Sequence, residues 1–225
     1  TDIPIPTTIS YGTNPHDYTL GLGEDYNDAD FGYAPTGCLP IFDFSLDGLG
    51  NPLVAGDIID DEWSMWGITV YTDDPASHPA MIFDSSNPTG GDFDLGSPNS
   101  DFGGPGIGVG GSAGMPGENS VPQGNVLIIS EDGDQLDPDD NSSGGFIYFE
   151  FPFAAMVGEI SLLDIEENNE VIIRAYDGSG SLIKELMTLG LGDNSFQIAP
   201  LYAMGVRKLE FEFQGSGSIA AIDYC

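Results

Sequence analysis

Acidic side chains gather in two loops of this 225-residue chain, and they are the residues best suited to chemistry. The first loop offers four carboxylate or amide side chains: Asp84, Asn87, Asp92 and Asp94. The second loop offers seven: Glu131, Asp132, Asp134, Asp137, Asp139, Asp140 and Asn141. Ca²⁺ takes about six to eight oxygen ligands of these kinds. We therefore predict bound Ca²⁺ at these loops, and the alternative for each loop is a solvated polar turn.

The charge of the chain favours the metal. Four Lys and Arg residues stand against 37 Asp and Glu, which gives a formal net charge of −33, and residues 1–173 contain no Lys or Arg. Carboxylates at this density repel one another unless cations lie among them. The same balance argues against binding to nucleic acid or anionic membranes, because both rely on Lys and Arg. Adaptation to high salt is the alternative, although the acids gather in loops with Gly, Asn and Pro.

Motifs for catalysis occur in the chain but lack the context that their chemistry requires. Gly110-Gly-Ser112-Ala-Gly114 fits a nucleophile elbow, yet no strand precedes it and no helix follows. Gly106–Gly111 fits a dinucleotide-binding fingerprint, again without a strand and helix around it. His16 and His78 share no spacing that would indicate zinc. We therefore predict a protein that is not an enzyme.

The elements that must position the acidic loops have the pattern of β-strands. Alternating or β-branched apolar runs are separated by turn residues, and no amphipathic helix of ordinary length is indicated. The expected strands are 39–46, 67–72, 80–83, 125–130, 145–153, 159–165, 171–176, 181–186, 206–213 and 218–224. In the strand 145–153, Ile147, Phe149, Phe151 and Phe153 are expected on one face. This pattern predicts an all-β protein, an antiparallel β-sandwich of the jelly-roll type with long Gly- and Asp-rich loops.

Residues 1–37 are expected to form an extended arm, because Pro4, Pro6, Pro15 and Pro35 interrupt any helix. Residues 38–225 then form the sandwich domain. The acidic composition with few Lys residues indicates an extracellular protein, so we expect a disulfide between Cys38 and Cys225. Two unrelated buried thiols are the alternative. A disulfide would place the first and last strands side by side, and the chain has no transmembrane segment by its hydropathy.

Four segments at the two ends of the domain carry a further signal: Ile41-Phe-Asp-Phe44, Gly56-Asp-Ile-Ile-Asp-Asp-Glu-Trp63, Gly67-Ile-Thr-Val70 and Ser218-Ile-Ala-Ala-Ile-Asp-Tyr224. Together they resemble secreted galactose-binding-like jelly rolls, which include many carbohydrate-binding modules and bacterial surface domains. That resemblance implies a structural Ca²⁺ near the first and last strands, where Asp43, Asp57 and Asp223 would be its ligands. It also implies ligand binding by loops at the strand ends.

Two functions follow as expectations. The first is a structural subunit of an extracellular or cell-surface assembly, such as a matrix, filament or sheath, or a protein of adhesion. The second is a Ca²⁺-dependent, lectin-like carbohydrate-binding module. No aromatic platform for a sugar is evident in the sequence, which favours the first function. The expected partners are therefore other copies of the chain or an extracellular glycan or matrix.

Overall fold

The computed structural model describes residues 42–225. The expected arm, residues 1–37, and the first cysteine, Cys38, lie outside the described residues. The boundary between arm and domain therefore stays a prediction, and so does the disulfide between Cys38 and Cys225.

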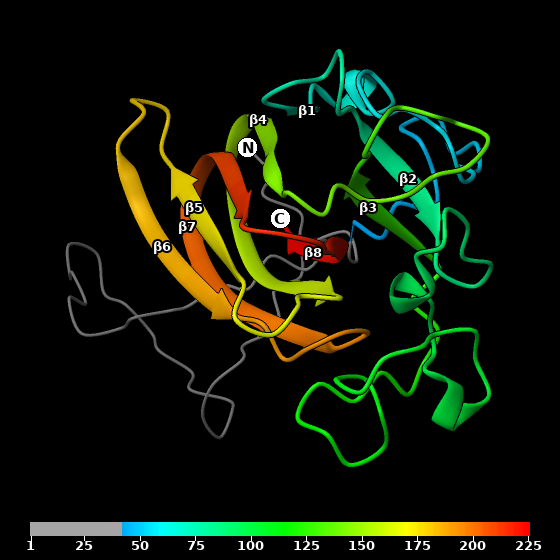
Figure 1. Cartoon of the computed structure of the whole chain (residues 1–225). Helices are drawn as coiled ribbons and strands as arrows, with labels where there is room; N and C mark the ends of the chain where they lie inside the picture. The colour runs from blue at the N-terminus through cyan, green and yellow to red at the C-terminus, as the bar shows by residue number, and fades with distance from the viewer. Residues whose placement is uncertain (1–41) are drawn as a thin grey trace, which may run out of the picture. The chain divides into compact units, whose positions relative to one another are not determined.

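Eight strands form one antiparallel, hydrogen-bonded sheet (Figure 1). In chain order they are β1 (Thr69–Thr72), β2 (Ala80–Asp84), β3 (Asn125–Ile129), β4 (Gly145–Leu163), β5 (Glu170–Tyr176), β6 (Leu182–Leu189), β7 (Phe196–Phe213) and β8 (Ser218–Tyr224). Their order across the sheet is β2-β3-β8-β4-β7-β5-β6, and β1 pairs with β4. The predicted class, an all-β antiparallel sandwich, is confirmed, with all strands joined in one continuous sheet.

The helical segments of residues 42–225 are three short 3-10 turns: η1 (Ser64–Trp66), η2 (Phe93–Leu95) and η3 (Ser100–Phe102). None of them is long and apolar enough to cross a membrane. Two of the three lie in the long Gly-rich loop between β2 and β3, which contains both rejected catalytic motifs.

Two long strands let a single sheet enclose a core. The sequence predicts separate strands at 145–153 and 159–165, but the chain continues through both as the 19-residue β4. Register shifts in β4 between Glu150 and Glu159 mark bulges, which bend a strand and increase its twist. The first part of β4 pairs with β1 and the second with β8, while β7 follows both parts. The bulges also explain why Phe153 is 48% exposed, so its expected place on the inner face is wrong.

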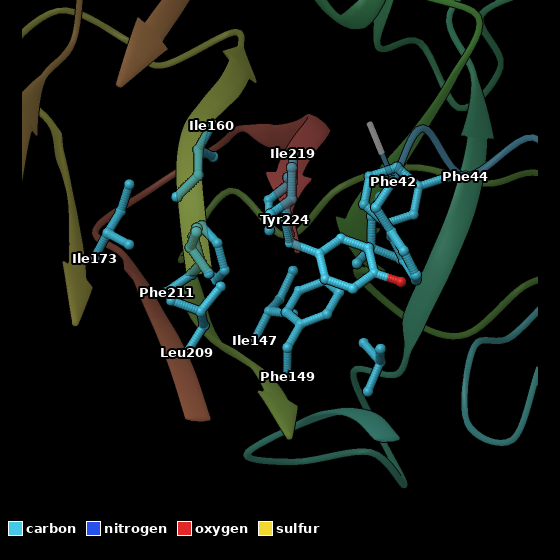
Figure 2. Close-up of a cluster of buried hydrophobic side chains, with 14 of the residues drawn as sticks. Phe42, Phe44, Ile147, Phe149, Ile160, Ile173, Leu209, Phe211, Ile219 and Tyr224 are labelled. Atoms are coloured by element: carbon cyan, nitrogen blue, oxygen red, sulfur yellow. The ribbon is translucent and has the colours of Figure 1, made fainter. Parts of the chain in front are cut away.

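The main core lies inside the folded sheet (Figure 2). Ile147, Phe149 and Phe151 are buried and alternate with half-buried or exposed residues along β4, as their period of two predicts. Rings from distant segments meet them, and the centroids of Phe42 and Trp63 are 4.4 Å apart. A second apolar cluster joins β2, β3 and the loop residue Leu95. This second cluster anchors the long loop after β2 to the sheet.

The expected neighbourhood of the first and last strands is confirmed. Phe42 and Ile222 exchange backbone hydrogen bonds of 2.8 and 3.1 Å in antiparallel orientation. The expected strand 39–46 is nevertheless wrong for its described part, where Phe42 and Leu46 make only isolated bridges. Phe44 interrupts the extended backbone with a φ of 58°, a conformation that a strand cannot contain.

Candidate cation site

The two acidic loops meet. The amide of Gly90 donates to Asp137 Oδ1 at 2.8 Å, and the amide of Asp140 donates to Asp92 Oδ2 at 2.7 Å. The strands explain this contact only in part, because β2 and β3 are antiparallel and Asp84 pairs with Asn125. Asp84 therefore lies at one end of this strand pair and Glu131, which follows Ile129, at the other. The long loop after β2 must run back along the sheet before residues 89–92 reach the second loop.

Two carboxyl groups are buried where the loops meet. Asp164 is 0% exposed and Asp140 is 7% exposed. Asp140 Oδ2 accepts hydrogen bonds from Ser216 Oγ at 2.7 Å and from the Gly217 amide at 2.6 Å. Asp164 Oδ1 accepts from the Asn194 amide at 2.6 Å. Asp164 Oδ2 also lies 3.0 Å from Ser216 Oγ.

That shared hydroxyl has a chemical consequence. A serine hydroxyl carries one hydrogen, so Ser216 can donate to Asp140 or to Asp164 but not to both. If both carboxyls are ionised, Ser216 Oγ donates its hydrogen to one of them. It then faces an oxygen of the other carboxylate with no proton between the two atoms. The arrangement is stable only if one carboxyl binds a proton or if a cation neutralises the pair.

The electrostatics of the cluster agree with this reasoning. The pKa of Asp140 is raised to about 7, chiefly by burial and also by the charges of Asp92 and Asp94, although hydrogen bonds from Ser216 and Gly217 act to lower it. Burial raises the pKa of Asp164 well above its usual value, and the charges of Asp94 and Asp140 add to this effect. Burial also raises the pKa of Asp139 to about 6, with contributions from Asp92 and Glu131. Each of these carboxyls therefore resists carrying its charge here.

The loop carboxyls Asp92 and Asp94 share this behaviour, since burial raises the pKa of each. One oxygen of Asp139, Oδ1, is buried and has no hydrogen-bond partner. Buried polar atoms without a partner are uncommon in native proteins. We define the acidic cluster as these five residues: Asp92, Asp94, Asp139, Asp140 and Asp164.

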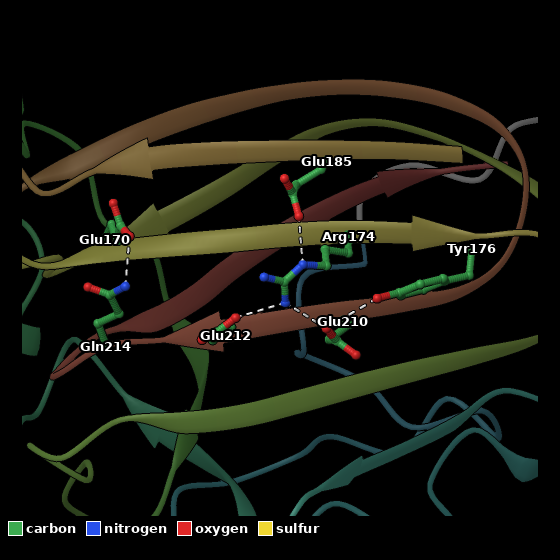
Figure 3. Close-up of polar contacts among 7 residues, drawn as sticks. All are labelled: Glu170, Arg174, Tyr176, Glu185, Glu210, Glu212 and Gln214. Carbon is green, nitrogen blue, oxygen red and sulfur yellow. Dashed lines mark hydrogen bonds and ion pairs between the residues drawn. The ribbon is translucent and has the colours of Figure 1, made fainter. Parts of the chain in front are cut away.

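Protein cations do not neutralise the acidic cluster. The four Lys and Arg residues of the chain lie on β5, β6 and β7. In residues 42–225 the ion pairs are those of Arg174, which binds Glu185, Glu210 and Glu212 at 2.8 Å each (Figure 3). These pairs lie on the open face of the sheet and not in the acidic loops.

The acidic cluster is wider than a closed metal site. Among the described residues, the group of three acids whose oxygens all lie within 4.8 Å of one another is Asp60, Asp61 and Glu62. Asp60 and Asp61 are exposed and no orphaned buried atom faces this trio, so it does not carry a site. No three residues of the acidic cluster bring one oxygen each that close together. One ion bound there would need side-chain movement or bridging water.

Several predicted ligands instead cap turns of their own loops. Asp84 Oδ1 accepts from the Ser86 amide, which closes the turn after β2. Asp132 and Asp134 each accept from the amide two residues further on, and so does Asn141. These contacts are those of solvated Asx turns, the alternative given for each loop. Asn87 is exposed, and Glu131 lies beside Asp139.

The structure does not bring together the third predicted set of Ca²⁺ ligands, those expected near the first and last strands. Asp43 Oδ1 accepts from the Ser45 amide at 3.1 Å, and Asp57 Oδ2 accepts from the Val54 amide at 2.8 Å. Asp223 is exposed on β8. Although Phe42 and Ile222 are paired, the described residues do not bring these three carboxylates within ligating distance of one another.

Three residues of the site are missing from the sequence-based prediction: Asp164, Asn194 and Ser216. The signal for Asp164 is present, because it is a lone charge in the apolar run 160–165. Asn194 gives no such signal. Its side chain donates to the carbonyls of Asp94 and Gly96 at 2.6 Å each, which fixes the first loop beside Asp164.

A separate pocket of about 400 Å³ is lined by residues of β4, β5 and β7 and by the turn after β5. Glu150, Lys208 and Tyr176 line it from β4, β7 and β5, where they are neighbours in register. Asp177 and Arg207 complete a lining with two carboxylates and two cations. This balanced charge is unusual in a chain of net charge −33.

Aromatic rings extend from this pocket across the sheet. The centroids of Tyr71 and Tyr148 are 4.9 Å apart, and Phe146 stacks on Tyr148 at 6.0 Å. Lys208 Nζ lies 4.1 Å from the centroid of the Tyr148 ring. The sequence did not reveal this row, because β1 and β4 that carry it are far apart in the chain.

Comparison of the sequence with models of known protein families and with curated proteins finds no match. The resemblance to galactose-binding-like jelly rolls therefore stays a prediction.

Proposed function

We propose that this chain is a non-enzymatic, Ca²⁺-stabilised β-sandwich protein with a structural or adhesive role in an extracellular or cell-surface assembly. The observation that supports the proposal most is the buried pair Asp140 and Asp164, which share the single hydrogen of Ser216. A buried pair of this kind requires a proton or a cation.

Ca²⁺ fits this donor set better than other common ions. The proposed ligands are carboxylate oxygens. His78 lies near the second loop, but its Nδ1 is 3.1 Å from the Ser130 carbonyl oxygen, and a set dominated by carboxylates disfavours zinc. Mg²⁺ demands a near-ideal octahedron, whereas Ca²⁺ accepts irregular sets of oxygens and water. A cluster with wide spacing and loop-borne ligands therefore suits Ca²⁺. The acids that we propose as ligands are Asp92, Asp94, Asp139, Asp140 and Asp164.

The extracellular location and the assembly role are supported by charge and composition. A net charge of −33 opposes association of copies unless salt or divalent cations screen it. Extracellular Ca²⁺ would provide that screening, and a disulfide between Cys38 and Cys225 would be stable in the same environment.

The metal is tested by thermal unfolding of the full chain in EDTA and in CaCl₂. Binding to the native state must raise the melting temperature, and ligand at about 100 times its Kd contributes about 2.7 kcal/mol. Asp140→Asn should abolish most of this rise. Asp60→Asn, in the exposed acidic trio, is the matched control and should keep it. A melting temperature that CaCl₂ does not change would contradict the proposal.

The assembly role is tested by electron microscopy of the protein with CaCl₂ and with EDTA. We expect ordered assemblies in Ca²⁺ that dissociate when the chelator is added. Monodisperse particles in both conditions would contradict an assembly role and leave the metal test unaffected.

A second candidate function, a carbohydrate-binding module, is favoured by the pocket beside Tyr176. Its mixed carboxylates and cations could exchange hydrogen bonds with sugar hydroxyls, while the half-buried ring of Tyr176 offers an apolar face. A glycan array followed by calorimetry tests this function. Tyr176→Ala should remove binding. Tyr202, an exposed tyrosine on β7, lies outside the pocket lining, so Tyr202→Ala should leave binding unchanged. A silent array in Ca²⁺ would count against the module.

A further inference from the structure

The strands at the two ends of the strand order, β2 and β6, differ in how their outer backbone groups are satisfied. The outer edge of β2 is covered by the segment before it, where the Ile59 amide donates to the Ala80 carbonyl at 2.8 Å. The Ile82 amide donates to the Asp57 carbonyl, and the Gly56 amide donates to the Ile82 carbonyl, at 2.9 Å each. The backbone groups of this edge are therefore already satisfied, and β2 is closed to another strand.

The opposite edge, β6, pairs on one side only. Its partner is β5, and no other segment of residues 42–225 adds to its outer side. Figure 1 shows β6 at the margin of the sheet. Its eight residues contain no proline. An open edge presents a row of unpaired amide and carbonyl groups, which is a template for a further strand.

The side chains of β6 also favour contact. Four of its apolar residues are exposed, with fractions from 38% to 65%: Leu182, Ile183, Met187 and Leu189. A monomeric edge is usually protected by charges or proline. The charged residues of β6, Lys184 and Glu185, cancel, so the strand has no net charge.

The surrounding charge makes this margin the place where two copies can approach. All four cations of the chain lie on β5, β6 and β7, so the repulsion between two chains of charge −33 is weakest here. The acidic cluster involves the loops beside β2 and β3, at the other end of the strand order. At physiological salt, charges separated by more than about 8 Å are largely screened.

We propose that β6 is a self-association interface, at which it pairs antiparallel with β6 of a second copy of this chain. Antiparallel pairing of one edge with itself has twofold symmetry and joins two sheets into one. Because a twofold pairing occupies the open side of β6 in both copies, this contact by itself stops at a dimer. A longer assembly would be built from such dimers through another contact. This inference deepens the assembly role proposed above and rests on it.

The test is sedimentation of the full-length chain over a range of concentrations, with CaCl₂ and with EDTA. We expect a monomer–dimer equilibrium in both. The double variant Ile183→Lys/Met187→Lys places four added positive charges at the pairing of two copies, and should weaken dimerisation at least about tenfold. Met204→Lys, on an exposed methionine of β7, is the matched control and should not change it. The single variant Leu189→Lys serves if the double variant fails to fold.

Hydrogen exchange of the β6 amides supplies a second readout. Their protection should rise with protein concentration as the dimer forms. A monomer at all concentrations, or a dimer that the Lys variants do not weaken, would overturn the proposal. Protection of the outward-facing β6 amides, those not bonded to β5, in a monomer would also overturn it, because another part of the chain would then cover this edge. A dimer that forms equally in CaCl₂ and in EDTA is the expected result, and the metal is tested separately by thermal unfolding.

Discussion

At the acidic cluster, protonation and metal binding are two solutions to the same electrostatic problem. Asp164 and Asp140 are both buried, and one hydroxyl hydrogen lies between them. A proton satisfies the pair at low pH, and a cation satisfies it at any pH where the carboxyls can ionise. The two solutions therefore differ in how stability depends on pH, and that difference can be measured.

Without metal, the protein should be more stable at about pH 5 than at about pH 8. The pKa of Asp140 is raised to about 7 and that of Asp139 to about 6, above an unfolded value near 4. A raised carboxyl pKa gives stability that is fully present below the unfolded pKa and is lost as pH rises through the folded pKa. Urea unfolding in EDTA should show this loss between about pH 4 and 7, from the unfolded pKa to the folded pKa of Asp140.

Saturating Ca²⁺ should flatten that dependence, because the ion replaces the lost protons. Asp140→Asn should flatten it in EDTA as well, since it removes one of the titrating groups. A stability in EDTA that rises steadily from about pH 5 to 8 would contradict the raised pKa values.

Asp164→Asn should distinguish neutralisation of the pair by a proton from neutralisation by a cation. The amide keeps an acceptor for the Asn194 N–H and adds a donor toward Ser216, while it removes one buried charge. In EDTA at neutral pH this variant should be at least as stable as the wild type, yet it should gain little from CaCl₂. Asp164→Ala leaves the Asn194 amide without an acceptor and should cost about 1–3 kcal/mol. Equal Ca²⁺ responses of Asp164→Asn and the wild type would exclude Asp164 as a ligand.

At the scale of elements, Asn194 joins the long Gly-rich loop to the sheet. Its Oδ1 accepts from the side chains of Asn99 and Asn119, and its Nδ2 donates to two loop carbonyls. Its φ of 64° is a conformation that Asn tolerates better than most residues. One side chain thus fixes the loop that carries Asp92 and Asp94.

Asn194→Ala should therefore destabilise the chain by about 3 kcal/mol or more, because several buried groups lose their partners at once. Asn168→Ala is the matched control. Asn168 has a φ of 73° but is exposed, so its replacement carries the backbone cost without the buried network. Urea unfolding compares the two variants. Equal losses would show that the positive φ, and not the hydrogen bonds, decides the effect.

The sequence predicted these elements to different extents. Alternation along residues 145–151 identified an inner face that the structure confirms, because period two follows directly from strand geometry. The merging of two expected strands into β4 was not predictable, since bulges depend on pairing with β7 and β8. The acidic loops could be predicted because their Asp, Glu and Asn residues are close together in the sequence. Asn194 and Ser216 were not, because they join the site only through contacts between distant segments.

At the scale of the whole molecule, a net charge of −33 has two competing explanations, adaptation to high salt and a specific cation site. Adaptation to salt requires only screening of diffuse repulsion, which any electrolyte supplies. A built site requires a particular cation. The exposed turns of Asp132 and Asp134 agree with the first explanation, and the buried pair of Asp140 and Asp164 agrees with the second. Both explanations predict that salt stabilises the protein, so a melting temperature in concentrated NaCl does not separate them.

Low concentrations of divalent ion do separate them. About 1 mM CaCl₂ added to about 0.15 M NaCl leaves the Debye length near 8 Å, so it changes the screening of surface charges very little. A rise in melting temperature under these conditions must come from ions bound to the native state. We expect such a rise for CaCl₂, a smaller one for MgCl₂, and none for additional NaCl of equal ionic strength. Differential scanning calorimetry measures all three, with Asp140→Asn as the variant that should lose the CaCl₂ response. Equal responses to the three salts would show that the carboxylates of this chain are screened and not ligated.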